Sequence, residues 1–438
     1  MIIAAPASGS GKTLVTLGLL KHLARKKNRI VSAKVGPDYI DPAFHAAATR
    51  MPCRNLDSWA MRPEILSQTL RDLTADGDLI ICEGVMGLFD GARGQSDAFD
   101  GSTAALARFT GWPVILVVDA SHQAASVAAL VRGFAGHDPG VSLRGVIFNR
   151  VGSEAHAAIV TEACAETLPF LPVLGCLPRA DGLELPSRHL GLVQAGEHQE
   201  LDAFLERAAD WVAAHLDLPA LGSIFAPLGI EAGTGASSPL PPLGQRIAVA
   251  RDTAFAFSYP HILQGWRDAG AEITFFSPLA DEAPGADADA VYLPGGYPEL
   301  HAGVLAAAGS FLGGLRTAAG RGASLFGECG GYMVLGERLI DAEGSSHDMA
   351  GLLALQTSFA ERRLHLGYRE VIQKTAGPPG KKGGVFRGHE FHYARIVSET
   401  GARPLFQASN AAGEDMGDMG LADGNVAGSF VHLIDRRD

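Results

Sequence analysis

The chain has 438 residues, of which 47% are hydrophobic and 19% are charged, and its formal net charge is −12. This length exceeds a single ordinary core, so we expect two or three domains. The acidic balance argues against nucleic acid and against an anionic membrane surface as main partners, although a local basic site could still bind an anionic small molecule.

The cysteines and the apolar runs indicate a cytoplasmic protein. Five cysteines stand far apart, with no C-x-x-C pair, at positions 53, 82, 164, 176 and 329. An odd, scattered set is typical of reduced thiols rather than of a disulfide framework. The N-terminal Met-Ile-Ile-Ala-Ala run lacks the basic segment of a signal peptide and is interpreted as a buried strand. No stretch reaches the roughly 18 apolar residues of a membrane span, so no membrane partner is expected.

The first half of the chain alternates short apolar runs with helical segments. We predict a helix at Thr13–Ala24. Strands are predicted at Ile2–Ala5, Ile30–Val35, Asp78–Cys82, Val114–Asp119, Gly145–Asn149 and Val173–Leu177. Buried strands separated by helices predict an α/β fold with a parallel sheet and helices on both faces. Ligands of such sheets bind beyond the carboxyl ends of the strands, so the polar residues there are the site candidates.

A phosphate-binding turn is predicted between the first strand and the first helix. Residues 5 to 13 read A-P-A-S-G-S-G-K-T and depart from G-x-x-x-x-G-K-[ST] because Pro6 takes the first glycine position. Backbone N–H groups of such a turn bind phosphate oxygens, the lysine meets the terminal phosphates, and the hydroxyl holds Mg²⁺. The predicted ATP-binding residues are Ser8, Gly9, Ser10, Gly11, Lys12 and Thr13.

Carboxylates follow two of the predicted strands. Asp38 and Asp41 come after the second strand, beside Lys34, and Glu83 closes the third. Oxygen ligands of this kind suit Mg²⁺, although two aspartates next to prolines would equally form turns.

A second α/β domain is predicted after a Gly-, Pro- and Ser-rich linker at residues 226–244. We therefore expect domains at residues 1–225 and 245–438. Strands of the second domain are predicted at Ile247–Ala250, Glu272–Phe276, Ala290–Leu293 and Ala323–Phe326.

The second domain contains the elements of a cysteine nucleophile. Cys329, in G-E-C-G-G, stands between a predicted strand and a helix, on a sharp exposed turn where the helix N-terminus would favour the thiolate. His432 is the candidate general base. The amides of Gly295 and Gly296, together with the N–H of Gly330, are the candidate oxyanion hole.

Three stretches carry a family resemblance: K-V-G-P-D-Y-I-D-P, E-G-V-M-G-L-F-D-G and L-P-S-R-H-L-G-L. They resemble the cobyrinic acid a,c-diamide synthase family, and the first half is more distantly similar to dethiobiotin synthetase. Residues 246 to 438 resemble class I glutamine amidotransferases. The resemblance implies a P-loop NTPase-like domain fused to a flavodoxin-like glutaminase, each built on a mainly parallel sheet with helices on both faces.

The resemblance also implies roles for single residues. Thr13, Asp41 and Glu83 would surround Mg²⁺, with Asp38 as an alternative ligand. Asn149 matches a position that reads adenine in dethiobiotin synthetase, but it could equally cap the strand end.

The reaction implied by the resemblance is a two-step amide synthesis. Cysteine-catalysed hydrolysis of glutamine releases ammonia, and ATP converts a substrate carboxylate into an acyl phosphate that ammonia attacks. The acceptors would be the a- and c-acetate groups of a corrin-ring acid on the route to cobalamin. Whether this acid is metal-free or carries cobalt stays open, with a slight preference for the metal-free form. Arg188 and His189 would meet its carboxylates or else lie on the surface. The oligomeric state also stays open, a homo-oligomer being one outcome.

One position departs from the class I pattern. That pattern has a glutamate two residues after the histidine, where this chain has Ile434. We hypothesise that Glu390, in G-H-E-F-H-Y, orients His432 instead; a structural or substrate-facing role for Glu390 is the alternative.

Two other functions are kept as alternatives. The first is amidation of other corrin side chains, as in cobyric acid synthases. The second is a regulatory or partitioning ATPase of the deviant P-loop class, which would leave Cys329 and His432 without a role.

Overall fold

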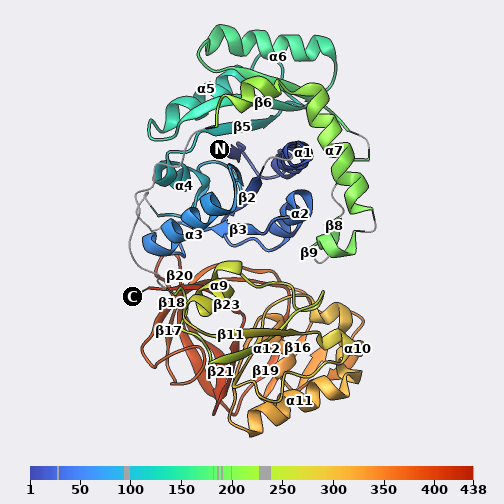
Figure 1. Ribbon diagram of the computed structural model, residues 1–438, viewed down its shortest axis with the longest axis vertical. Coiled ribbons are helices and arrows are strands. Elements are labelled where there is room, and N and C mark those ends of the chain that lie inside the picture. The colour runs from blue at the N-terminus through green and yellow to red at the C-terminus, as the bar shows by residue number, and fades with distance from the viewer. Residues whose placement is uncertain are drawn as a thin grey trace. The chain divides into compact units, whose positions relative to one another are not determined.

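The computed structural model (Figure 1) describes residues 1–26, 29–92, 99–180, 182–184, 187–188, 191–198, 200–225 and 238–437, with the backbone alone for residues 187, 188, 191 and 192. The chain divides into two compact units. The first holds Met1–Trp59 and Leu66–Thr234, and the second holds Ala60–Ile65 and Gly235–Asp438. Most of the predicted linker, residues 226–237, lies outside the described residues, so the domain boundaries stay a prediction.

The first unit is built on a parallel sheet with the strand order β3-β2-β4-β1-β5-β6-β7. Its strands are β1 (Ile2–Ala4), β2 (Ile30–Val35), β3 (Cys53–Leu56), β4 (Leu79–Glu83), β5 (Val114–Asp119), β6 (Leu143–Val151) and β7 (Val173–Pro178). Its apolar runs are buried because helices cover both faces, as the sequence predicted. The strand β3 was not predicted, since polar side chains interrupt its short apolar pattern.

The helices of the first unit are α1 (Lys12–Arg25), α2 (Ile40–Thr49), α3 (Pro63–Asp76), α4 (Thr103–Thr110), α5 (Val127–His137), α6 (Glu154–Thr167), α7 (Leu201–His215) and α8 (Leu218–Gly222). The first residues of α3, up to Ile65, are assigned to the second unit. The short hairpin of β8 (Ser187–Arg188) and β9 (Gly191–Leu192) and the turn η1 (Ala195–Glu197) precede α7. Helix α7 packs beside α1, where the Arg25 guanidinium bonds Glu206 and Asp210. These bonds hold the carboxyl end of α1 against α7, and the phosphate-binding turn lies at the opposite, amino end of α1.

The second unit has a mixed sheet with the order β11-β10-β12-β13-β22-β21-β20-β17-β18-β23. Its parallel half consists of β10 (Arg246–Ala250), β11 (Glu272–Phe276), β12 (Ala290–Leu293), β13 (Ser324–Glu328) and β22 (Val426–Ser429). Its antiparallel half consists of β17 (His365–Gln373), β18 (Val385–His392), β20 (Arg403–Asn410), β21 (Asp415–Asp423) and β23 (Val431–Arg436).

The α/β class of the second unit is confirmed, but the expectation of a mainly parallel sheet holds only for its first half. In β18, buried residues alternate with half-exposed ones, which is the pattern of an antiparallel strand with one covered face. This curled antiparallel extension brings β23, and with it His432, back to the sheet.

Helices and a small second sheet complete the second unit. The helices are α9 (Pro260–Asp268), α10 (Ala302–Ala307), α11 (Gly309–Gly320) and α12 (Gly330–Leu335), with the single turns η2 (Pro278–Ala280) and η3 (Pro298–His301). The small sheet joins β14 (Arg338–Ile340), β15 (Ser346–Asp348), β16 (Leu355–Ser358) and β19 (Arg395–Glu399). A core that includes Phe311, Leu325 and Tyr332 fills the space between these elements.

The segment Ala60–Ile65 belongs to the second unit although it precedes the linker by more than 150 residues. Arg62 contacts Asp435 on β23, which is fully buried. The backbone N–H of Arg62 lies 2.7 Å from Asp435 Oδ2, and the guanidinium Nη2 lies 2.9 Å from Oδ1. Burial raises the pKa of Asp435 to about 6, against the opposing effect of Arg62.

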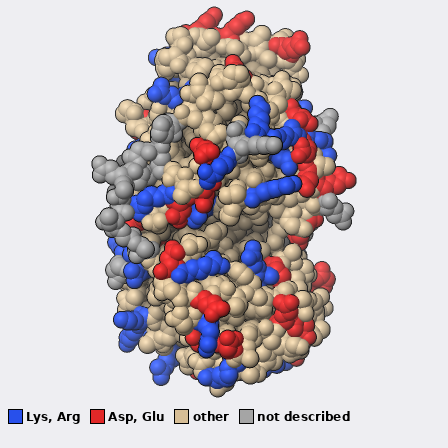
Figure 2. All heavy atoms as spheres, in the orientation of Figure 1, with Lys and Arg blue, Asp and Glu red and all other residues tan. Residues whose placement is uncertain are grey.

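Neither a face of single-sign charge, in the view of Figure 2, nor a membrane-length apolar helix is seen among the described residues. On the face shown in Figure 2, basic and acidic side chains are interspersed. Among the described residues, no single helix has the length and apolar character to cross a membrane; by those two criteria alone the pair Pro298–Ala307 and Gly309–Gly320 could, but it is bent by 87°.

Candidate active sites

The predicted phosphate-binding turn lies between β1 and α1 and depends on two glycines. Gly9 and Gly11 have φ values of 79° and 91°, in the left-handed region that favours glycine. A β-carbon at position 11 would stand 2.2 Å from Asn149 Nδ2. Gly11 also caps the N-terminus of α1, so backbone N–H groups of the first helical turn face the cavity where an anion would bind.

Asn149, on β6, supports this turn directly. Its side-chain Nδ2 donates a hydrogen bond of 3.0 Å to the carbonyl of Ser10, and its Oδ1 accepts from the N–H of Arg150 at 2.9 Å. The residue is buried and lines the same cavity as the turn. Its amide therefore holds the turn in place. Its role in reading adenine stays a prediction.

Lys12 points from the turn toward the loop that follows β4. Its Nζ donates to the carbonyl of Met86 at 2.6 Å. This loop is tied to the turn by a backbone hydrogen bond from Leu88 N–H to the Ala5 carbonyl. Burial lowers the pKa of Lys12, and the nearby positive charge of Lys34 lowers it further. A negatively charged phosphate would stabilise the ammonium at this position.

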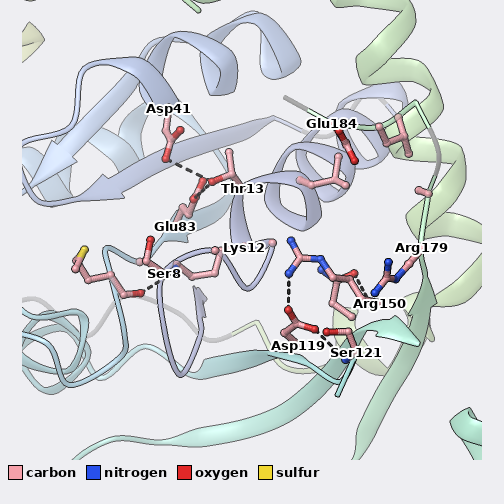
Figure 3. A pocket seen from close by; sticks show the side chains of 18 of the residues that line it. Ser8, Lys12, Thr13, Asp41, Glu83, Asp119, Ser121, Arg150, Arg179 and Glu184 are labelled. Atoms are coloured by element: carbon pink, nitrogen blue, oxygen red, sulfur yellow. Dashed lines mark hydrogen bonds and ion pairs between the residues drawn. The ribbon is translucent and has the colours of Figure 1, made fainter. Parts of the chain in front are cut away.

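The three predicted magnesium ligands meet at the start of α1 (Figure 3). The hydroxyl of Thr13 donates to Glu83 Oε1 at 2.6 Å and lies 3.5 Å from Asp41 Oδ2. Hydroxyl and carboxylate oxygens are the ligands that Mg²⁺ prefers, so these residues fit that ion. Asp38 instead uses Oδ1 to accept the backbone N–H groups of Ile40 and Asp41, at the start of α2.

Lys34, which the sequence places beside Asp38 and Asp41, is a buried cation of the same cluster that was not among the predicted site residues. Lys34 Nζ lies 2.5 Å from Asp41 Oδ2 and 2.9 Å from Glu83 Oε1, and its side chain is 4% exposed. Burial opposes the charge, but the carboxylates of Asp41, Glu83 and Asp38 outweigh it and raise the pKa of Lys34 well above its ordinary value. The contact of Lys34 with Glu83 depends on the strand order, because β2 pairs with β4 and this pairing sets Lys34 opposite Glu83.

The pKa values of the two carboxylates in the cluster are shifted in opposite directions. Burial, with the Asp38 charge, raises the pKa of Asp41 to about 7. Burial acts in the same direction on Glu83, but Lys34, His45 and Thr13 outweigh it and hold the pKa of Glu83 well below its usual range. His45 Nε2 lies 2.7 Å from Glu83 Oε2 and fixes this carboxylate from the side away from Thr13. Glu83 is thus ionised and rigidly held.

A cavity of about 990 Å³ extends from this cluster along the carboxyl ends of the strands. Its far end is lined by Asp119, Arg150 and Arg179, which Figure 3 shows at a distance from Thr13. Arg150 forms an ion pair with Asp119 and has a φ of 58°, so β6 turns sharply at this point. The cavity is large enough for a nucleotide together with part of a second substrate.

The two predicted corrin-binding residues are not described in full. Arg188 lies in β8, where the backbone alone is described, and His189 lies outside the described residues. Their role stays a prediction.

In the second unit, Cys329 lies on a strained turn between β13 and α12. Its φ is 47°, an uncommon value for a residue with a side chain. A β-carbon at Gly331 would stand 2.0 Å from the Leu293 carbonyl, so glycine is required where the turn contacts the end of β12. The backbone N–H of Cys329 donates to the Ser429 carbonyl at 2.8 Å, which joins the turn to β22.

The resting state of Cys329 differs from the expectation. The sequence predicts an exposed thiol on a turn where a helix N-terminus favours the thiolate, whereas the side chain is buried. Burial instead raises the pKa of Cys329 above its ordinary value, and the Glu299 and Glu390 carboxylates add to this effect. The N–H of Gly330 acts in the opposite direction but is outweighed by burial. The Sγ atom lies 3.9 Å from the carbonyl of Phe391, so the thiol donates there.

His432 and the predicted oxyanion hole both adjoin the Pro294-Gly295-Gly296 segment. A β-carbon at Gly295 would stand 2.2 Å from His432 Cε1, and one at Gly330 would stand 3.1 Å from the backbone N of Gly296. Burial lowers the pKa of His432 to about 3, and the charges of His389 and His392 act in the same direction. The imidazole is therefore neutral, and burial disfavours its protonated form in this state.

The structure favours the alternative role for Glu390. Its Oε2 accepts from Arg369 Nε at 2.7 Å, and its Oε1 lies 2.9 Å from His392 Nε2. The strand register pairs Glu390 with Val431, while His432 pairs with His389. Neighbouring residues of a strand point to opposite faces, so Glu390 is committed to a structural ion-pair cluster rather than to orienting His432.

A possible metal-binding group in the same region is disfavoured by its geometry. Ligand atoms of His365, Glu390 and His392 lie within 4.8 Å of one another. The two imidazoles stack with centroids 4.7 Å apart and planes 4° apart. Ring nitrogens of parallel stacked imidazoles do not converge on one ion, and Arg369 already neutralises Glu390.

Comparison with known proteins relates each unit to a domain family. Residues 246–438 match the CobB/CobQ-like glutamine amidotransferase domain, and residues 1–193 match the CobQ/CobB/MinD/ParA nucleotide binding domain. The chain is 56% identical to the hydrogenobyrinate a,c-diamide synthase of Brucella anthropi over 99% of this chain and 98% of that protein. It is 55% identical to the enzyme of the same name from Sinorhizobium sp, with the same two coverages. Among solved structures, PurLQS from Thermotoga maritima matches 43% of this chain and 86% of its own at 18% identity, with a TM-score of only 0.31.

Proposed function

We propose that this chain, which belongs to the hydrogenobyrinate a,c-diamide synthase family, amidates two carboxylates of a corrin-ring acid with glutamine as nitrogen donor and ATP as energy source. The observation that carries the proposal is that one chain contains the candidate residues of two separate centres. One unit holds a phosphate-binding turn with oxygen ligands for Mg²⁺, and the other holds a cysteine on a strained turn beside glycine amides.

The proposed glutaminase step uses Cys329 as nucleophile and His432 as general base. The neutral imidazole of His432 takes the thiol proton of Cys329, and the thiolate attacks the side-chain amide carbon of glutamine. The N–H groups of Gly296 and Gly330 stabilise the oxyanion that forms. The imidazolium returns the proton to the leaving ammonia, and water then hydrolyses the thioester to glutamate.

The ligase step takes place at the centre of the first unit. The turn and Lys12 bind the triphosphate, and a substrate carboxylate attacks the γ-phosphorus, which yields an acyl phosphate and ADP. Thr13, Asp41 and Glu83 would hold Mg²⁺, which when bound neutralises phosphate charge. Lys34 keeps these buried carboxylates in place. Ammonia then attacks the acyl carbon and phosphate leaves, so that a carboxamide forms.

The acceptor is proposed to be metal-free hydrogenobyrinic acid, because relatives more than half identical over 98% of their length are named hydrogenobyrinate a,c-diamide synthases. Arg188 and His189 are proposed to meet its carboxylates, and Asn149 to line the nucleotide site. We further propose a cytoplasmic enzyme with an amidoligase domain at residues 1–225 and a glutaminase domain at residues 245–438.

Product analysis tests the proposal. The protein is incubated with Mg-ATP, glutamine and either hydrogenobyrinic or cobyrinic acid, and the products are examined by mass spectrometry. Two successive replacements of OH by NH₂ on the metal-free acid, and none without ATP, are expected. Amidation of the four other side chains would support the cobyric acid synthase alternative. ATP hydrolysis that is indifferent to both glutamine and corrinoid would support the regulatory ATPase.

A further inference from the structure

Glu328, directly before the nucleophile, is a carboxylate buried beneath the active-site turn. It is 1% exposed. A carboxylate in such a place must be hydrogen-bonded, because burial without partners costs several kcal/mol. Its Oε1 accepts the backbone N–H of Leu433 at 3.0 Å, and its Oε2 accepts the hydroxyl of Tyr292 at 2.7 Å.

The two partners flank the remaining parts of the glutaminase centre. Leu433 follows His432 on β23. Tyr292 lies on β12, shortly before the turn that contains Gly295 and Gly296. One buried carboxylate therefore joins the strand of the nucleophile to the strand of the base and to the strand that leads to the oxyanion glycines.

The contact to Leu433 falls where β23 departs from regular pairing. Strand β18 pairs Gly388 with Leu433 and Arg387 with Asp435, so Ile434 is an extra residue on β23. Such a bulge redirects neighbouring side chains. The carbonyl of Ile434 accepts from His261 Nε2 at 2.9 Å, which holds the bulge from the other side.

This arrangement bears on the missing glutamate of the class I pattern. At position 434, where that pattern has a carboxylate, this chain has a buried isoleucine. We propose that Glu328 is a positioning residue of the glutaminase reaction, which places His432 through the Leu433 N–H and the glycine turn through Tyr292. The proposal rests on the glutamine-dependent function proposed above.

The test compares Glu328→Ala with Glu328→Gln in the full-length protein, with hydrolysis of glutamine to glutamate as the readout. An alanine removes both hydrogen bonds, and a misplaced base lowers kcat by about 100-fold, with KM for glutamine unchanged. A glutamine side chain keeps an oxygen for the Leu433 N–H, so Glu328→Gln is expected to restore most of kcat. Synthesis with ammonium salts as nitrogen donor should be unaffected in both variants.

Tyr292→Phe serves as a second variant that removes a single hydroxyl, should the alanine variant fold poorly. It is expected to lower kcat for glutamine hydrolysis and leave ammonium-dependent synthesis intact. Equal losses with both nitrogen donors, or a Glu328→Gln variant as impaired as Glu328→Ala, would overturn the proposal. Glutamine hydrolysis needs no corrinoid, so a failure of the proposed acceptor would be seen separately.

Discussion

The α-carbon of Gly295 lies against the imidazole of His432, so that a β-carbon at this position would stand 2.2 Å from His432 Cε1. Since β12 and β23 stand at different places in the sheet, this contact joins the oxyanion segment to the candidate base.

We predict that Gly295→Ala displaces His432 and lowers glutamine-dependent synthesis by about 100-fold. Ammonium-dependent synthesis should be retained, because the first unit is untouched. Gly313→Ala is the matched control, since a β-carbon there meets nothing within 4 Å. The measurement is diamide formation with each nitrogen donor. If Gly295→Ala formed the diamide from glutamine at the wild-type rate, the assignment of His432 as the base would be contradicted.

Replacement of the nucleophile should separate the two centres. In Cys329→Ser the hydroxyl is a far weaker nucleophile, so glutamine hydrolysis should fall by on the order of 1,000-fold. Synthesis from ammonium salts should continue. Cys164→Ser, at a buried cysteine of the first unit, is the control and should keep glutamine hydrolysis. An active Cys329→Ser enzyme with glutamine as donor would refute the assignment.

Replacement of the phosphate-binding lysine should have the opposite pattern. Lys12→Met removes the ammonium that is predicted to contact the terminal phosphates, so synthesis with either nitrogen donor should fall by about 100-fold. Basal glutamine hydrolysis should persist. Lys26→Met, at an exposed position just after α1, is the control. A selective loss with glutamine alone would contradict the predicted role of Lys12.

The position of Asn149 predicts how its removal affects nucleotide use. Because its amide holds the Ser10 carbonyl, Asn149→Ala should raise KM for ATP and for GTP together, by about 10-fold each. Steady-state kinetics with both nucleotides provide the measurement. An altered ratio of ATP to GTP use would instead support direct reading of adenine.

Glu328 predicts a pH dependence of stability. Burial raises the pKa of Glu328 to about 7 from an ordinary value of 4.5. The folded protein therefore keeps this proton between these pH values while the unfolded chain releases it. Its stabilising contribution is complete below pH 4.5 and is lost as the pH rises through 7, by on the order of 3 kcal/mol.

Comparison with Glu328→Gln isolates this effect. The difference in free energy of unfolding between wild type and Glu328→Gln should fall as the pH rises from 4.5 to 7, measured by urea unfolding at several pH values. A difference that stays constant over this range would mean that the carboxylate does not titrate there.

Much of the first unit was predictable because its strands are continuous apolar runs. The strands β2 and β5 were predicted with their observed bounds. In contrast, β3 contains Arg54 and Asn55, whose pairing with Asp72 and Asp76 or with backbone carbonyls is invisible in a local pattern. The antiparallel half of the second sheet escaped prediction because strands such as β18 alternate buried and half-exposed residues instead of forming continuous apolar runs.

The candidate site was predictable where its chemistry lies in contiguous motifs. The turn around Lys12 and the turn around Cys329 are local, so their residues were found together. The contact of Lys34 with Glu83 depends on β2 lying beside β4, and that of Glu328 with Leu433 joins residues 105 positions apart. Strand order and long-range pairing of this kind are not encoded in any short stretch.

The ion pair of Arg62 with Asp435 has a consequence for gene fission. If the gene were divided into two genes near residue 235, the C-terminal fragment would contain the fully buried Asp435 carboxylate but not the guanidinium of Arg62. Removing one member of such a pair typically costs about 3–5 kcal/mol. After such a break, the C-terminal fragment would be stable only in association with the N-terminal fragment. To be stable alone, it would need a compensating substitution at position 435.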